Sequence, residues 1–371
     1  MNEILREEAI QIIEDNDKLK EIKGTNFMIT GASGMIGIYF VNTLLTLNEL
    51  YGYDINLYLV VRSPKKLPEY VLENKNVHII EQDIVSPIMS DVNVDYVIHA
   101  ASPASPLIMK EKPVETNFAN TIGTANALTY ANNHGAKGFL FVSSREIYGQ
   151  PEEGQEFFYE DGKLGQVDHL VPRNGYAEGK KAAENMCAGF KEEYGLNAKV
   201  VRLAHTYGPG MSIYDGRVQA DFLKNIVNNE NIVLKSKGES VRTYTYIADA
   251  VNGMFKVLLH SNDMVYNIAD EACKTSIREL AETMVAIYPE RGLKLVFDIP
   301  KETTNQGTAS FTLGILATDK IRKELGWKPK YSISSGFKRT IDYLESEMKR
   351  EKPVMLERKV HQWCTFILEI C

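Results

Sequence analysis

The sequence predicts an α/β fold in which a doubly wound parallel sheet carries a second, smaller lobe. Short apolar runs at residues 27–30, 55–61, 77–80, 96–100 and 139–143 alternate with stretches of helical periodicity. Strands that alternate with helices in this way form a parallel sheet with helices on both faces. With 371 residues, 44% of them hydrophobic and 25% charged, the chain is globular in composition and long enough for two lobes.

A glycine-rich turn follows the first predicted strand. The stretch from Phe27 to Gly37 reads FMITGASGMIG, and helical periodicity resumes at Ile38. Gly31 would permit a tight turn, Gly34 would let the backbone approach a pyrophosphate, and Gly37 would let the helix pack closely on the strand. The phosphates would face the N-terminus of that helix. We therefore expect a Rossmann-type domain that binds a dinucleotide through Gly31, Ser33, Gly34, Met35, Ile36 and Gly37.

The end of the second predicted strand bears on which dinucleotide is bound. An acidic residue here usually holds a ribose hydroxyl, whereas an arginine accommodates a 2′-phosphate. The segment from Arg62 to Lys66 reads RSPKK and contains three cations and no acid. Arg62 therefore favours NADP over NAD, with a solvated basic loop as the alternative. Asp83, after the third strand, would either face the adenine or cap the next turn.

The pattern divides the chain into four parts. A helical extension at 1–24 has apolar residues on one face, which would cover the domain edge or bind a partner. The Rossmann domain spans 25–205, with a return at about 233–262, and a substrate-binding lobe at 206–350 is interleaved with it. The tail at 351–371 has apolar residues at helical spacing, which favours packing on the body or on a neighbouring subunit over membrane contact.

Within the second lobe, the periodicity predicts several elements. These are helices at 218–227, 249–260 and 276–287 and a strand at 232–234. Ser276 and Glu279 have the spacing of a capping box. The polar, glycine-punctuated segment at 301–314 would be a loop near the substrate mouth.

Composition excludes several classes of function. The net charge is −7, and no cluster of Lys and Arg suits nucleic acid. The four cysteines are scattered, which indicates neither a metal site nor a disulfide framework and is typical of reduced, cytoplasmic thiols. No apolar run approaches the ~18 residues of a membrane span, and the N-terminus lacks the pattern of a signal peptide. We expect small-molecule partners and neither nucleic acid nor membrane.

Two later segments carry the candidate chemistry. Ser143 to Gly149 follows the fifth strand, and Tyr176 and Lys180 lie one turn apart on a predicted helix. A lysine cation beside a phenol would lower the tyrosine pKa from about 10 and so provide a base near neutral pH. A serine hydroxyl could hydrogen-bond the same oxygen. Taken alone, this tyrosine–lysine spacing is also typical of a plain surface pair.

Together these motifs resemble those of an extended short-chain dehydrogenase/reductase, from the group of nucleotide-sugar epimerases, dehydratases and decarboxylases. GASGMIG, SSREIYG and YAEGK occur in the family's order, followed by LGWKP at 325–329, and the resemblance covers roughly residues 25–345. Within the group, the chain is most similar to UDP-glucuronate decarboxylases. The shared segments are SPASP at 102–106, NTIGT at 120–124, GYAEGKKAAE at 175–184 and DGRV at 215–218.

The resemblance implies a catalytic triad of Ser144, Tyr176 and Lys180, with Asn120 in the surrounding hydrogen-bond network and Arg242 on the nucleotide diphosphate. It also implies a nucleotide-sugar substrate, NAD or NADP as cofactor, a small lobe that closes over the substrate, and a homodimer. Further cofactor contacts are expected at Ala100, Ala101, Asn120 and Lys180, and substrate contacts at Ser102, Arg145, His205, Arg217 and Arg242.

The segment around Glu146 limits which of the family's reactions this chain could catalyse. Dehydratases of the group have threonine-aspartate-glutamate and decarboxylases threonine-serine-glutamate where this chain has Ser144, Arg145 and Glu146. An arginine cannot protonate a departing hydroxyl, because it stays charged. It could steer a substrate carboxylate by a charge-assisted hydrogen bond, although holding that carboxylate would also stabilise the ground state. The alternative role for Arg145 is as a partner of Glu146.

Two more positions depart from the family. His205 stands where the family commonly has an asparagine that contacts substrate, and it would serve either as a substrate contact or as a structural histidine. Gly210 stands where the decarboxylases have an arginine. These changes leave room for a substrate other than UDP-glucuronate.

The expected activity is oxidation at C4 of a nucleotide sugar, then decarboxylation or 4,6-dehydration, then return of the hydride. The alternatives are an epimerase and an NADPH-dependent reductase of a nucleotide-linked sugar, which Arg62 favours and Glu146 disfavours. A third hypothesis is a protein that binds a dinucleotide without catalysing a reaction.

Overall fold

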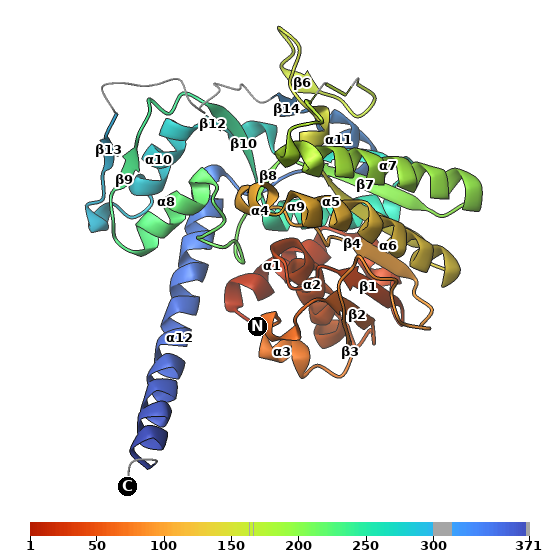
Figure 1. Ribbon diagram of the computed structural model, residues 1–371, viewed down its shortest axis with the longest axis horizontal. Helices are drawn as coiled ribbons and strands as arrows, with labels where there is room; N and C mark the ends of the chain where they lie inside the picture. The colour runs from red at the N-terminus through yellow and green to blue at the C-terminus, as the bar shows by residue number, and fades with distance from the viewer. Residues whose placement is uncertain (163, 166, 300–313, 369–371) are drawn as a thin grey trace.

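A seven-stranded parallel sheet forms the centre of the computed structural model, which describes residues 1–162, 164–165, 167–299 and 314–368 (Figure 1). Its strand order is β11-β7-β5-β4-β1-β2-β3, and all neighbours are parallel. The fold class expected from the sequence is confirmed. The strands are β1 (Asn26–Thr30), β2 (Asn56–Val61), β3 (Val77–Glu81), β4 (Tyr96–His99), β5 (Gly138–Ser144), β7 (Ala198–Leu203) and β11 (Val265–Ile268).

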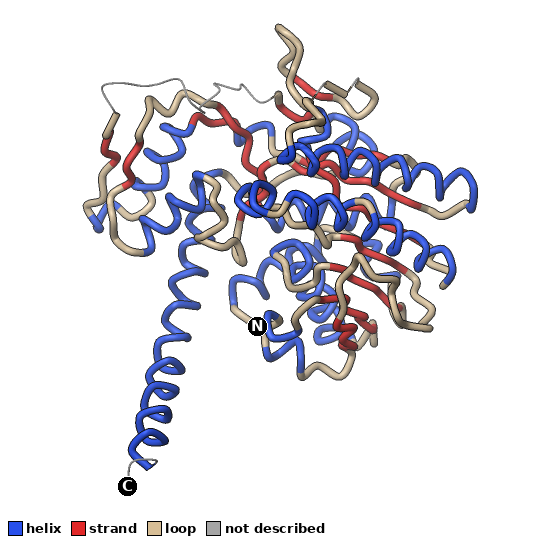
Figure 2. Tube along the Cα trace, in the orientation of Figure 1, coloured by secondary structure: helices blue, strands red, loops and turns tan. Residues whose placement is uncertain are grey.

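Helices cover both faces of this sheet (Figure 2). Along β1, Phe27 and Ile29 belong to one core cluster and Met28 to another, because successive side chains point to opposite faces. On one side lie α1 (Glu3–Glu14), α2 (Met35–Tyr51) and α9 (Ile247–His260), and on the other lie α5 (Pro113–Asn120), α6 (Ile122–Asn133) and α7 (Gly175–Tyr194). Both faces of the sheet are therefore buried, as parallel sheets require.

The smaller lobe is built mainly from segments that follow β7. A three-stranded sheet has the order β12-β10-β8, and β9 pairs with β13 beside it. Its elements are β8 (His205–Tyr207), β9 (Ile232–Leu234), β10 (Val241–Tyr246), β12 (Lys274–Ser276), β13 (Leu295–Phe297), α8 (Val218–Val227), α10 (Ile277–Ala286) and α12 (Ile333–Leu368). The predicted capping box of Ser276 and Glu279 is present at the start of α10. Between these elements the chain returns to the central sheet through α9 and β11.

Short elements complete the structure. They are α3 (Glu69–Leu72), α4 (Pro106–Glu111), α11 (Asp319–Leu325) and the pair β6 (Phe157–Phe158) and β14 (Ile315–Leu316). The loop expected at 301–314 lies outside the described residues, apart from Gly314. Residues 351–368 continue α12, which runs away from the body in Figure 1. Within the described ranges, no helix is long and apolar enough to cross a bilayer.

The glycine turn between β1 and α2 is tightly packed. Gly31 has a φ of +70°, and a Cβ added there would lie 2.7 Å from Ala101 Cα. A Cβ at Gly37 would lie 2.4 Å from the Gly31 carbonyl oxygen. Gly34 directly precedes α2 as its N-cap residue. The first and third glycines therefore serve the turn and the helix–strand packing expected of them.

We predict that Gly37→Ala lowers the free energy of unfolding by about 1–3 kcal/mol, because the added methyl group overlaps backbone atoms that cannot rotate away. Chemical denaturation measures the change. Gly189→Ala is the matched control, since Gly189 is an exposed residue of α7 and nothing described lies within 4 Å of its added Cβ. That variant should gain up to about 1 kcal/mol, and equal effects of the two variants would contradict the packing argument.

Candidate active site

A cavity of about 690 Å³ opens among the carboxyl end of β5, the start of α7 and the elements of the smaller lobe. Segments from both parts of the chain therefore contribute to one site, at the sheet edge where α/β proteins bind ligands. The lining residues are Pro106, Arg145, Glu146, Gly149, Gln150, Val167, Asp168, Arg173, Asn174, Ala177, His205, Arg217, Val218, Gln219, Arg242 and Tyr244.

The charged lining of this cavity is mostly positive. Four arginines face two acids, Glu146 and Asp168. Cationic side chains in a cleft with low-dielectric walls attract anionic ligands and hold them more strongly than they would in water. The cavity therefore suits a ligand with several negative charges.

The end of β5 and the turn that follows it carry Ser144 and Glu146. Ser144 ends the strand, and its Oγ accepts a hydrogen bond from the Glu146 backbone N–H at 3.2 Å. Arg173 donates from both Nη atoms to the Glu146 carboxylate, at 2.7 and 3.1 Å. Sequence reasoning missed Arg173, because it lies in a short 3-10 turn between motifs, where no spacing links it to Glu146.

Tyr176 and Lys180 are both buried on α7. Lys180 Nζ donates to the Val142 carbonyl oxygen at 2.7 Å and lies 5.8 Å from the centroid of the Tyr176 ring. Burial lowers the pKa of Lys180 to about 7, against the opposing charge of Glu184. The two side chains converge as their spacing predicts, with Lys180 anchored to β5.

The pKa of Tyr176 differs from the sequence expectation. Burial raises it to about 12, and the charge of Glu146 adds to the rise, while the Ser144 hydrogen bond and the charges of Arg217 and Arg173 oppose it. Desolvation of the phenolate thus dominates, and Lys180 is not among the main groups that lower this pKa, contrary to what the spacing suggested. A proton acceptor at Tyr176 needs further positive charge or hydrogen bonding from whatever the site binds.

Arg145 is the least satisfied cation of the described site. Its side chain is only 8% exposed, and its Nε has no hydrogen-bond partner among the described residues. Burial lowers its pKa to about 10, with the charge of Glu146 opposing and those of Arg242 and Arg173 adding to the fall. Because Arg173 makes the bidentate contact to Glu146, Arg145 is available to another anion in the cavity.

His205 is neutral in this setting. Burial, together with the charges of Arg145, Arg242 and Arg217, holds its pKa well below the ordinary value. Its Nδ1 lies 3.2 Å from the Thr243 carbonyl oxygen, so that nitrogen must carry the proton and donate it. Nε2 is then an acceptor at the cavity wall.

Of the other residues predicted to contact substrate, two line the cavity and one does not. Arg217 donates to the Ala104 carbonyl and pairs with Asp215 at 3.2 Å, and Arg242 also lines the cavity. Ser102 does not line the cavity, and its Oγ donates to Asn120 Oδ1 at 2.7 Å. Two buried residues that sequence reasoning missed, Gln219 and Tyr244, line the cavity, and their side-chain Nε2 and hydroxyl lack partners in the described part of the chain.

Most of the predicted dinucleotide residues lie at the carboxyl ends of β1 to β4, whereas Asn120 and Lys180 lie on α5 and α7. The turn at Gly31 packs against Ala101, whose N–H donates to Thr30 Oγ1 at 3.3 Å. Arg62 and Asp83 are exposed and lie 4.0 Å apart. Asp83 Oδ1 accepts the Val85 N–H at 3.1 Å, so Asp83 caps the next turn. This is one of the two roles predicted for it.

Comparison with known proteins agrees with this geometry. Residues 27–269 match the model of the NAD dependent epimerase/dehydratase family. The chain belongs to this family. This match confirms the family resemblance and the α/β fold predicted from the sequence. Because the family is one of NAD-dependent enzymes, it favours an enzyme over a non-catalytic dinucleotide-binding protein.

Curated relatives span most of the chain. UDP-glucuronic acid decarboxylase 1 of Xenopus tropicalis is 28% identical over 337 residues, which cover 90% of this chain and 75% of the relative. UDP-glucuronic acid decarboxylase 5 of Arabidopsis thaliana is 30% identical, covering 83% of this chain and 86% of the relative. Among solved structures, UDP-glucose 4-epimerase of Thermotoga maritima with UDP-glucose superposes with a TM-score of 0.72 at 26% identity, covering 87% of this chain and 99% of that one.

We predict that Arg145→Met raises the free energy of unfolding by about 1–2 kcal/mol, because it removes a buried charge with an unpartnered donor. The same change should weaken binding of an anionic ligand in the cavity. Denaturant titration and calorimetry give the two values. Arg173→Met is the control: it breaks the contact with Glu146 and should not stabilise the protein, so stabilisation of both variants would contradict this account.

Proposed function

We propose that the protein converts UDP-glucuronate to a UDP-pentose by oxidation at C4, loss of the C6 carboxylate as carbon dioxide, and return of the hydride. The observation that carries the proposal is the buried, partly unpartnered Arg145 in a cationic cavity next to Ser144 and Tyr176. The names of the curated relatives support the same substrate.

The chain's residues fit a dinucleotide. A Cβ at Gly31 would strike Ala101, so the turn keeps backbone at the place where a pyrophosphate would approach α2. Gly31, Ser33, Gly34, Met35, Ile36 and Gly37 would hold the phosphates, with Ala100, Ala101 and Asn120 across the crevice. When bound, the nicotinamide would take up and return a hydride.

The choice between NAD and NADP rests on Arg62. Its exposed guanidinium could meet a 2′-phosphate, which is the reason for expecting NADP. The Asp83 carboxylate at 4.0 Å partly neutralises it and would repel that phosphate. We propose that NAD is accepted at least as well as NADP.

Ser144, Tyr176 and Lys180 would carry the oxidation step. Tyr176 would accept the proton of the C4 hydroxyl, with the Ser144 hydroxyl bonded to the same oxygen. Lys180, held on the Val142 carbonyl, would favour the phenolate form of Tyr176 that accepts this proton. Ser102 would have an indirect role: its hydroxyl donates to Asn120 Oδ1 and so would orient the Asn120 side chain in the crevice.

Arg145 decides between decarboxylation and dehydration. Once C4 is a ketone, the C6 carboxylate belongs to a β-keto acid; the C5–C6 bond breaks, and its electron pair moves to the C4 oxygen as an enolate. A proton from water then adds at C5, which restores the C4 ketone that takes back the hydride. Arg145 would orient that carboxylate, His205 and Gln219 would contact the sugar, and Arg217 and Arg242 the diphosphate. Elimination of water would need an acid where Arg145 stands, so dehydration ranks second.

Mass spectrometry of nucleotide sugars incubated with purified protein tests the proposal. We expect UDP-glucuronate to lose the mass of carbon dioxide without added reductant, and Tyr176→Phe to slow this reaction by a factor of about 100 or more. Loss of water would instead support dehydration. A gain of two hydrogens only with added NADPH would replace the proposal by the reductase alternative.

A second proposal concerns assembly, and we infer a homodimer. Val114 and Phe118 on α5 and Ile122 at the start of α6 follow at spacings of four and are 63%, 49% and 40% exposed. This stripe runs beside α7, against which α5 packs. A row of exposed apolar side chains on a helix pair suits burial against its own copy.

We expect Phe118→Glu to shift the protein from dimer to monomer in size-exclusion chromatography with light scattering, because a charge would be buried in the interface. Leu50→Glu is the control, since Leu50 is 40% exposed on α2, on the other face of the sheet from this stripe, and should leave the mass unchanged. A wild-type protein that is monomeric at micromolar concentration would rule out the proposed interface.

A further inference from the structure

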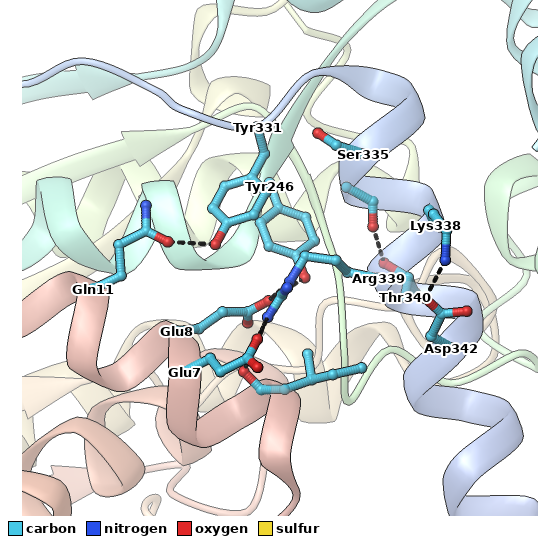
Figure 3. Close-up of polar contacts among 12 residues, drawn as sticks. Glu7, Glu8, Gln11, Tyr246, Tyr331, Ser335, Lys338, Arg339, Thr340 and Asp342 are labelled. Carbon is cyan, nitrogen blue, oxygen red and sulfur yellow. Dashed lines mark hydrogen bonds and ion pairs between the residues drawn. The ribbon is translucent and has the colours of Figure 1, made fainter.

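The N-terminal helix α1 lies between the central domain and the C-terminal part of the chain. Its buried Leu5, Ile12 and Ile13 pack in the core shared with α2 and α9. Other α1 side chains point toward α12 and the segment before it, as Figure 3 shows. Gln11 accepts from the Tyr331 hydroxyl, and Asp15 pairs with Lys330. The helix therefore touches both parts at once.

Glu8 is the centre of this contact. Its side chain has no exposed surface, and it accepts three hydrogen bonds of 2.6 Å. The donors are the hydroxyl of Tyr39 on α2, the hydroxyl of Tyr246 on β10 and Nε of Arg339 on α12 (Figure 3 shows the last two). A buried carboxylate is costly unless its oxygens are bonded in this way, so the three elements are held at fixed positions around it.

Strand β10 connects Glu8 to the cavity. Arg242, Tyr244 and Tyr246 alternate along the strand and so share one face. Arg242 and Tyr244 line the cavity, whereas Tyr246 reaches Glu8. The neighbouring strand β8 is in matching register, with His205 of the cavity opposite Tyr244. The ribbon formed by β8 and β10 thus runs from the substrate side to Glu8 without a break.

Behind the cavity, this ribbon is packed by aromatic rings. Tyr207 stacks on Phe337 of α12 at 4.0 Å between ring centroids, and Tyr246 lies 4.4 Å from Tyr331. Close-packed rings transmit a displacement rather than absorb it. A shift of Tyr246 would therefore move Tyr244 and Arg242 with it.

We propose that Glu8 is a positioning residue for the substrate side of the site: by holding Tyr246, it sets where β10 presents Arg242 and Tyr244. The proposal rests on the proposed function for the nature of the ligand, a nucleoside diphosphate sugar. It assigns a role to α1, which precedes the residues that match the family model.

Calorimetric titration with UDP and with NADH tests this role. We expect Glu8→Gln to weaken UDP binding about tenfold, since the amide nitrogen that replaces one oxygen cannot accept these donors, and to change NADH binding by less than twofold. Tyr246→Phe, which keeps the ring and loses one bond, should weaken UDP binding in the same direction. Glu7→Gln is the matched control, because Glu7 is 56% exposed and pairs only at the surface with Arg339.

Amide hydrogen exchange gives a readout that needs no ligand. Glu8→Gln should speed exchange in β10, residues 241–246, and leave β1, residues 26–30, unchanged. Equal loss of UDP and NADH binding, or unchanged protection of β10, would overturn the proposal and make α1 a general brace. A wild-type protein that binds no UDP would defeat the proposed function instead, and the exchange data would still decide the role of Glu8.

Discussion

The close approach of two chain segments at the carboxyl ends of β1 and β4 is the constraint on which this structure depends. In the order β3-β2-β1-β4-β5, the chain changes direction between β1 and β4, and a crevice opens there. Gly31 and Ala101 meet across it at a distance that leaves no room for a side chain. Because only backbone lines this point, α2 can direct its N-terminus at a phosphate, and Asn120 and Lys180 can stand across from it.

Buried polar and charged side chains in the cavity have fewer hydrogen-bond partners than two largely buried carboxylates outside it. Away from the cavity, these two carboxylates are well bonded: Glu184 forms a bidentate pair with Arg202 and also accepts from Ser143, and Glu8 has its three donors. In the cavity, Arg145 keeps an unpartnered Nε, and Gln219 and Tyr244 keep unpartnered polar atoms. Such groups cost stability in the ligand-free protein, which is the usual price of a site that must bind an anion.

Local patterns made most of the fold predictable from the sequence. The glycine turn, the first five strands, the helix at 218–227 and the capping box at Ser276 depend on residues that are neighbours in the chain. Arg173, Gln219 and Tyr244 come together only through tertiary contacts, so no spacing indicated them. The pKa of Tyr176 was misjudged for a related reason, since the spacing to Lys180 is visible in the sequence whereas the depth of burial is not.

In the proposed reaction, Arg145 would bind the substrate carboxylate that is later lost, and such binding stabilises the ground state as well as the transition state. Decarboxylation does not remove the negative charge; it moves the charge from C6 to the C4 oxygen. Arg145 follows Ser144 directly in the chain, and the Ser144 hydroxyl is among the groups that lower the pKa of Tyr176. A guanidinium that lines the cavity holding the substrate would stabilise the charge both before and after it moves, so the ground state would gain less than an isolated contact would give it. An arginine adjacent to the oxidation triad is therefore compatible with decarboxylation, whereas it has no proton to offer for loss of water.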